Sequence, residues 1–137
     1  MKTLFVDTSG WVASANRADL RHADMIRARD DWMSQGGMMV TTDYVVDEAL
    51  THMRTRFGLS VAEAWWEEIE FSERVRLEWV GSDRAAKARE MFFRHRDKEY
   101  SFTDCTSFVV MKELKLNQTL TTDKHFTQAG FQVLPAA

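Results

Sequence analysis

Short apolar runs alternate with longer helix-forming stretches along almost the whole chain, and this alternation limits the folds open to it. The runs that indicate strands are 2–6, 38–41, 75–80, 118–121 and 131–134. Helical patterns fill the intervals, from the first run through Asn16 and then at 20–34, 43–57, 60–71, 82–95 and 103–116, with a short turn near Lys124. Strands that alternate with helices predict an α/β fold, with a mainly parallel five-stranded sheet covered on both faces.

The length and composition predict one domain over residues 1–137. The chain is 45% hydrophobic, which is ample for a single core, and its one proline and six glycines leave no candidate linker. Cys105 is the only cysteine, so no internal disulfide forms, and we expect it to be a small buried residue. No run approaches the roughly 18 apolar residues of a membrane span, and the first apolar run is too short for a signal peptide. We therefore expect a cytoplasmic protein without a membrane partner.

Four acidic residues adjoin elements that should be buried. Asp7 and Asp123 each follow a strand, whereas Glu48 and Asp104 belong to early turns of helices. Because ligands of open parallel sheets bind beyond the carboxyl ends of the strands, we expect Asp7 and Asp123 at one edge of the sheet. The two helical acids can lie over the same edge, so the connectivity predicts that all four converge.

Each acid also has a local explanation. Asp7 and Asp123 can cap the helical segments that follow them, and Ser101-x-x-Asp104 matches a capping box. Glu48 lies too far into its helix to cap, and a surface pair with His52, four residues on, is its local explanation. The same spacing suits zinc only weakly, because no second histidine matches. His125 resembles a catalytic partner of Asp123, but aromatic packing or solvent exposure is the expected role for it.

Joint placement decides between four caps and one site. Two carboxylates about 4 Å apart repel by roughly 4 kcal/mol at an effective dielectric constant near 20. Four such groups in one place need cations, and ligand sets made of oxygen suit Mg²⁺ or Mn²⁺. We therefore expect a divalent metal site, with raised carboxyl pKa values when the metal is absent.

These residues fall into an ordered set of motifs. The motifs are Val6-Asp7-Thr8-Ser9, Thr42-x-x-Val45-x-x-Glu48, Ser101-Phe102-Thr103-Asp104, and Leu120-Thr121-Thr122-Asp123-Lys124-His125-Phe126. Over essentially its whole length the chain resembles the PIN-domain ribonucleases. It is especially similar to the short VapC-type toxins of toxin–antitoxin pairs.

The resemblance implies a PIN-like three-layer sandwich and a Mg²⁺- or Mn²⁺-dependent endoribonuclease. It assigns Asp7, Glu48, Asp104 and Asp123 as the acidic tetrad that holds the metal and performs catalysis, with Thr8 and Thr121 as supporting hydroxyls. Such a site activates water for in-line attack on a backbone phosphate, leaving a 5′-phosphate and a 3′-hydroxyl. The implied partners are an RNA substrate, a cognate antitoxin and a second copy of the chain in a homodimer.

The substrate and partner contacts are less specific. A net charge of −3 argues against binding that relies on a general basic surface, so local cations must touch the RNA backbone. The candidates are Arg54, Arg56, Arg94, Arg96, Lys98 and Lys124. Adjacent helix positions point about 100° apart. Trp65 is therefore expected to face inward, and Trp66 to be more exposed and available to a protein partner.

Two other classes of protein remain open. A phosphoacceptor receiver domain also carries an aspartate at a strand end, but Thr8 and Ser9 stand where its paired acid belongs. A non-catalytic RNA- or protein-binding module with PIN-like architecture would bind without turnover.

Overall fold

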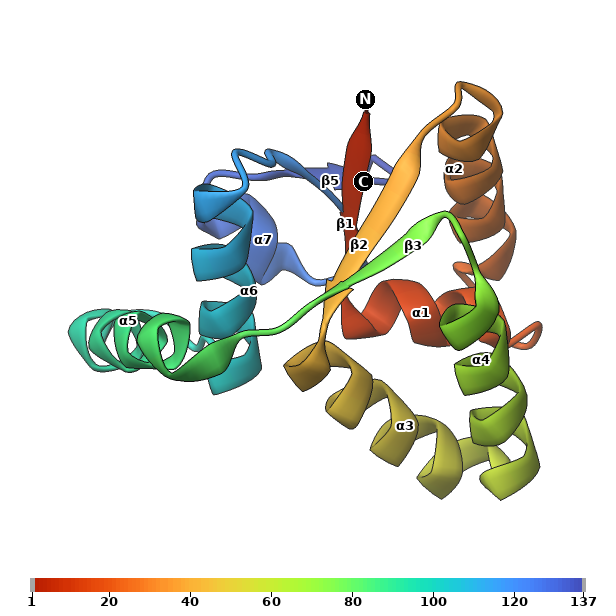
Figure 1. Cartoon of the computed structure of the whole chain (residues 1–137), viewed down its shortest axis with the longest axis horizontal. Coiled ribbons are helices and arrows are strands. Elements are labelled where there is room, and N and C mark those ends of the chain that lie inside the picture. The colour runs from red at the N-terminus through yellow and green to blue at the C-terminus, as the bar shows by residue number, and fades with distance from the viewer. Residues whose placement is uncertain (1, 137) are drawn as a thin grey trace.

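The computed structural model describes residues 2–136, which form five strands and seven helices (Figure 1). The strands are β1 (Thr3–Val6), β2 (Met38–Thr42), β3 (Val75–Glu78), β4 (Gln118–Leu120) and β5 (Gln132–Leu134). The helices are α1 (Thr8–Ala15), α2 (His22–Ser34), α3 (Asp43–Phe57), α4 (Leu59–Phe71), α5 (Gly81–Arg94), α6 (Phe102–Glu113) and α7 (Lys124–Gln128). All strand pairings are parallel, which confirms the predicted fold class.

The strand order β3-β2-β1-β4-β5 places β1 at the centre of the sheet. The chain adds β2 and β3 on one side of β1, and then crosses over to add β4 and β5 on the other. The order therefore reverses between β1 and β4, where Val6 lies opposite Leu120. This reversal creates a crevice beyond the carboxyl ends of the two strands, the usual ligand position in such sheets.

Helices cover both faces of the sheet (Figure 1). Helices α1, α2 and α4 lie on one side, α6 and α7 lie on the other, and α5 packs against α6. Helix α3 continues from the end of β2 past the carboxyl edge of the sheet. The side chains of Leu4, Phe5 and Val6 are completely buried, as expected for a central strand covered on both faces.

A tight contact at Gly10 joins α1 to the end of β4. A Cβ atom at Gly10 would lie 2.3 Å from the carbonyl oxygen of Leu120. The same carbonyl accepts a hydrogen bond from the Asp7 amide, at 3.2 Å. The turn that follows β1 therefore packs directly against β4, and a glycine is required at the point of closest approach.

Helix α3 has the predicted boundaries because both of its ends carry clear signals. The Thr42 hydroxyl accepts a hydrogen bond from the Val45 amide, and Gly58 ends the helix with a φ of +98°. The side chains of Val45, Val46, Ala49 and Met53 are buried. Glu48 flanks this buried stripe, and its exposed side chain lines the crevice.

The burial of Cys105, Trp65 and Trp66 agrees with the sequence-based expectations. Cys105 is completely buried, and Trp65 is buried while Trp66 is half-buried, as expected. Within residues 2–136, no helix is both long and apolar enough to cross a membrane. The single domain over residues 1–137 stays a prediction, and its first and last residues lie outside the described range.

Candidate active site

One cavity of about 410 Å³ is lined by all four predicted acids, Asp7, Glu48, Asp104 and Asp123. Asp7 and Asp123 stand at the starts of α1 and α7, just beyond β1 and β4. Asp104 lies in the first turn of α6, and Glu48 lies further along α3. We call this space the acid cavity. Its position beyond the carboxyl ends of β1 and β4 agrees with the convergence expected from the connectivity.

Asp7 is the most buried of the four acids, at 4% exposed. Its side chain makes no cap hydrogen bond to α1, so the local explanation for this residue is wrong. Instead its Oδ2 accepts hydrogen bonds from the Thr121 hydroxyl at 3.0 Å and the Ser9 hydroxyl at 3.4 Å. Burial, reinforced by the nearby charge of Asp104, raises the pKa of Asp7 to about 7. This acid is therefore partly protonated near neutral pH, as predicted for crowded carboxylates without metal.

A network of hydroxyl groups ties the end of β1 to the end of β4. The Ser9 and Thr121 hydroxyls lie 2.7 Å apart, and Ser9 also accepts a hydrogen bond from the Thr122 amide. Thr121 accepts another from the Asp123 amide. Thr121 was predicted as a supporting hydroxyl, but Ser9 was not. Its position two residues after Asp7 is the sequence signal that could have identified it.

The hydroxyl of Thr8 faces different surroundings. Thr8 lines the acid cavity and is 8% exposed, and its Oγ1 has no hydrogen-bond partner within residues 2–136. A buried hydroxyl without a partner is unfavourable, because its hydration is lost without replacement. Thr8 therefore offers a donor and an acceptor to whatever enters the cavity.

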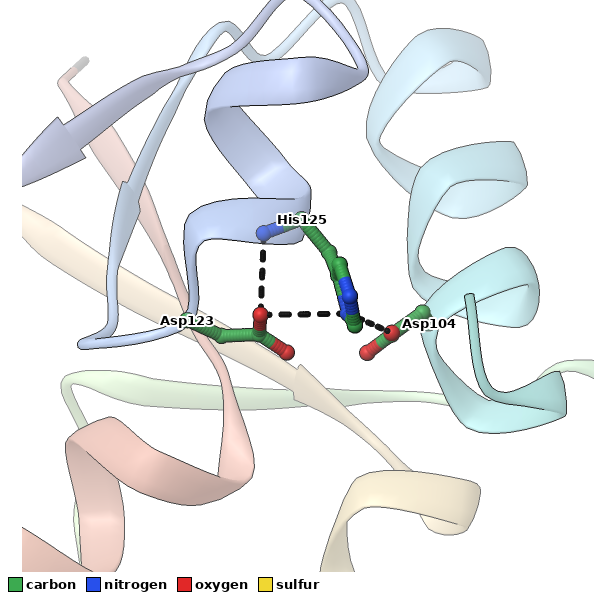
Figure 2. A group of neighbouring side chains, drawn as sticks. All are labelled: Asp104, Asp123 and His125. Carbon is green, nitrogen blue, oxygen red and sulfur yellow. Dashed lines mark hydrogen bonds and ion pairs between the residues drawn. The ribbon is translucent and has the colours of Figure 1, made fainter. Parts of the chain in front are cut away.

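Asp104, Asp123 and His125 form a compact group (Figure 2). Their ligand atoms lie within 4.8 Å of one another. The Nδ1 atom of His125 is 3.0 Å from Oδ2 of Asp104 and 3.2 Å from Oδ1 of Asp123. The remaining oxygens of the two carboxylates point toward each other beneath the imidazole ring, as Figure 2 shows. Burial raises the pKa of Asp104 and the charge of Asp123 adds to this, although the hydrogen bond from the Ser101 amide lowers it.

The predicted caps are also present at these two acids. Ser101 and Asp104 make both hydrogen bonds of a capping box, and Asp123 accepts one from the His125 amide. His125 packs edge-on against Tyr100 at 5.6 Å, as an aromatic role implies. Its bridge between the two acids was not predicted, because it depends on a distance between α6 and α7 that the sequence does not contain.

Glu48 lines the same cavity from α3 and is exposed. It lies outside the compact group, which is the only cluster of three or more potential metal ligands found among residues 2–136. The zinc alternative for Glu48 and His52 thus lacks a third ligand beside them.

The basic residues predicted to contact RNA differ in whether they line the acid cavity. Among the described residues, Arg56 is the only lysine or arginine that lines the acid cavity. Arg54, Arg94, Arg96, Lys98 and Lys124 do not line it. Asp19, from the loop between α1 and α2, contributes a fifth acid that no sequence pattern indicated.

The residues around the cavity fit a hard divalent cation. The atoms that could bind a metal are mainly carboxylate oxygens. One oxygen of Asp104 and one of Asp123 accept no hydrogen bond from residues 2–136. The raised pKa values of Asp7 and Asp104 show that negative charge is unfavourable here without a counter-ion. Oxygen-rich ligand sets of this kind suit Mg²⁺ or Mn²⁺.

Comparison with known proteins gives concordant results. A family model described as the PIN domain matches residues 4–132. The 23S rRNA-specific endonuclease VapC20 of Mycobacterium tuberculosis is 38% identical over 128 residues, which cover 93% of this chain and 95% of that protein. The crystal structure of that VapC20, described as a Sarcin-Ricin loop cleaving toxin, matches with a TM-score of 0.85 at 37% identity, over 93% of this chain and 95% of the other. VapBC2 from Rickettsia felis, bound to a promoter DNA fragment, shares the fold alone, with a TM-score of 0.70 at 8% identity over 96% of each chain.

Proposed function

Because this chain belongs to the PIN-domain family, we propose that it is a metal-dependent endoribonuclease of the VapC type and the toxin of a toxin–antitoxin pair. The near full-length identity of 38% to a 23S rRNA-specific endonuclease supports RNA as the substrate. We further propose 23S rRNA, and within it the sarcin-ricin loop, as the target. The bond that breaks is a backbone phosphodiester, and water is the attacking group.

Asp7, Glu48, Asp104 and Asp123 are the proposed catalytic and metal-binding residues, with Mg²⁺ or Mn²⁺ as the ion. The single observation that carries this assignment is the cavity that the four acids share. A divalent ion held there supplies Lewis acidity, which lowers the pKa of water and balances charge on the phosphate. Among the described residues, Arg56 is the only lysine or arginine that lines the cavity, and His125 is the only side chain that contacts both Asp104 and Asp123 through a ring nitrogen.

The surrounding side chains hold the acids in place. Thr121 and Ser9 donate to Asp7, so its carboxylate is fixed relative to the end of β4. His125 contacts Asp104 and Asp123 together and sets the direction of their remaining oxygens (Figure 2). The unpartnered hydroxyl of Thr8 is available to orient water or a phosphate oxygen. Side chains fixed in this way reduce the reorganisation needed for reaction.

Cleavage of purified RNA tests the proposal. We expect the protein to cut 23S rRNA in Mg²⁺ or Mn²⁺, to lose activity in EDTA, and to leave 5′-phosphate and 3′-hydroxyl ends. Asp7→Asn should lower the cleavage rate by at least about hundredfold, since losing even an indirect support of a metal commonly costs 10–100-fold. Wild-type cleavage by Asp7→Asn would refute the assignment, whereas RNA binding without turnover by the wild type would favour a non-catalytic module.

Protein partners form a further part of the proposal. We propose that a cognate antitoxin binds the chain, that the chain forms a homodimer, and that both act in the cytoplasm. Trp66 lines an apolar cavity of about 420 Å³ between α3 and α4, together with Val46, Leu50 and Ala62. A half-buried tryptophan in such a surface suits a protein partner. Trp66→Ala should reduce co-purification with the antitoxin, and unchanged recovery would remove Trp66 from the interface.

A further inference from the structure

One polar face of α3 continues away from the acid cavity. Glu48, His52 and Arg56 recur every four residues, so they lie on the same face of the helix. All three also line a second cavity of about 520 Å³, together with Asp47, Thr51, Thr55 and Thr103. We call this second cavity the α3 groove. Because the two cavities share three side chains, the α3 groove adjoins the acid cavity along the helix.

Arg56 stands at the outer end of this face. It lies two helical turns beyond Glu48, about 12 Å along the helix axis. Its side chain is exposed, and no carboxylate among residues 2–136 forms an ion pair with it. Guanidinium groups stay charged at all ordinary pH values and bind phosphate through two parallel hydrogen bonds. Arg56 is thus a cation without a local partner in surroundings that are otherwise acidic.

The chemistry of the α3 groove favours RNA over protein. Every side chain that lines it is polar or charged, and the hydroxyls of Thr51 and Thr103 can bond to phosphate and ribose oxygens, whereas the Thr55 hydroxyl donates to the Thr51 carbonyl. The core of a protein interface would instead require apolar or aromatic groups. Such groups line the Trp66 cavity between α3 and α4.

We propose that the α3 groove binds the RNA backbone beside the cleaved bond, and that Arg56 contacts a phosphate other than the one that is cut. This inference rests on the proposed ribonuclease function. It makes Arg56 a residue for substrate binding, because it stands at the outer end of the polar face of α3, two helical turns from Glu48. With a net charge of −3, the overall field of the chain does not attract RNA, so local cations such as Arg56 have to supply the attraction.

A matched pair of variants separates this contact from a general charge effect. Arg56→Gln and Arg54→Gln each remove one positive charge from α3, but Arg54 lines the Trp66 cavity and not the groove. Binding of a fluorescently labelled sarcin-ricin stem-loop RNA would be measured by anisotropy at several salt concentrations, in an Asp7→Asn background that leaves the RNA uncut. Arg56→Gln should raise the dissociation constant about tenfold or more. It should also make the salt dependence of log K less steep by about 0.7–0.9, the value for one lost phosphate contact. Arg54→Gln should change neither quantity.

Cleavage kinetics provide the second measurement. With Asp7 intact, Arg56→Gln should raise KM while kcat stays within about twofold, because a contact made equally in ground and transition states affects binding alone. Arg56→Lys keeps the charge but loses the paired hydrogen bonds, so it should give an intermediate KM. Single phosphates of the RNA can be replaced by neutral methylphosphonates. At one position beside the cleaved bond, this replacement should weaken RNA binding by the wild type but should not weaken RNA binding by Arg56→Gln any further.

The possible outcomes discriminate between the two proposals. If the wild type cleaves RNA but Arg56→Gln and Arg54→Gln bind it equally well, the groove inference is wrong and the proposed function stands. A fall in kcat with an unchanged dissociation constant would also contradict it. If the wild type binds RNA through Arg56 but never cleaves it, the ribonuclease proposal fails alone. Loss of a protein partner's binding in Arg56→Gln, with RNA binding intact, would reassign the groove to protein recognition.

Discussion

Asp104 and Asp123 each use one carboxylate oxygen for a helix cap and leave the other directed into the acid cavity. Oδ2 of Asp104 accepts from the Ser101 amide, and Oδ1 of Asp123 accepts from the His125 amide. Capping and metal binding are therefore compatible functions of the same side chain. The caps fix the side-chain rotamers, so the remaining oxygens are held ready for a ligand.

His125 should hold Asp104 and Asp123 in position for a metal ion. His125→Ala removes the contacts with Asp104 and Asp123, so the two carboxylates should separate and bind metal less tightly. We expect the Mg²⁺ concentration for half-maximal cleavage to rise about 10–100-fold, the usual effect of losing a group that orients metal ligands. His125→Asn keeps a donor near the position of Nδ1 and should retain most of the affinity. An unchanged Mg²⁺ dependence in His125→Ala would show that the bridge has no positioning role.

At the scale of elements, the site depends on the close approach of α1 to the end of β4. Gly10 allows this approach, and the Asp7 amide donates to the same Leu120 carbonyl that Gly10 packs against. Asp7 and Asp123 follow β1 and β4 respectively, so the spacing of these two elements sets the spacing of the two acids. The fold thereby controls the metal site through one backbone contact.

Gly10→Ala should disturb this contact. A methyl group 2.3 Å from a backbone oxygen cannot be accommodated unless α1 moves. Overpacking of this kind commonly costs about 1–3 kcal/mol, so the free energy of unfolding measured in urea should fall by that amount. Cleavage should also fall, because Asp7 moves with the start of α1. A variant with wild-type stability and wild-type activity would show that the turn tolerates a side chain.

Local sequence signals fix the ends of α3, whereas contacts between distant elements leave no local signal. Both ends of α3 were predicted correctly, because Thr42 and Gly58 give local signals. The strand expected at 75–80 ends at Glu78, where pairing with Thr42 of β2 stops, and Trp79 is 68% exposed. The choice of Arg56 over Arg54, and the bridge made by His125, depend on tertiary distances that no local pattern encodes.

At the scale of the whole molecule, crowding of the acids makes stability depend on pH. The pKa of Asp7 is raised from 3.8 to about 7, so between these values the folded protein binds more protons than the unfolded chain. The free energy of unfolding should therefore fall as pH rises from about 4 to about 7 when metal is absent, by a few kcal/mol. Protonated Asp7 stabilises the folded protein fully below pH 3.8, the pKa of Asp7 in the unfolded chain. This stabilisation is lost as the pH rises through about 7, the pKa of Asp7 in the folded protein.

Melting curves across this pH range in EDTA test the linkage. Asp7→Asn should melt at a higher temperature than the wild type at pH 7.5, and the advantage should shrink toward pH 4, where Asp7 is protonated. Millimolar Mg²⁺ should raise the melting temperature of the wild type by mass action and leave Asp7→Asn nearly unchanged. A wild-type stability that rises steadily between pH 4 and pH 7 in EDTA would contradict the raised pKa of Asp7.

We propose that acids from four separate segments meet in order to hold divalent ions. A crystal of the wild-type protein soaked in Mn²⁺ tests this, because anomalous scattering locates manganese without reference to activity. A peak should lie in the acid cavity with Asp7, Asp104 or Asp123 oxygens as ligands, and it should disappear in Asp7→Asn. A cavity without manganese at millimolar concentration, in a protein that still cleaves RNA, would contradict the claim.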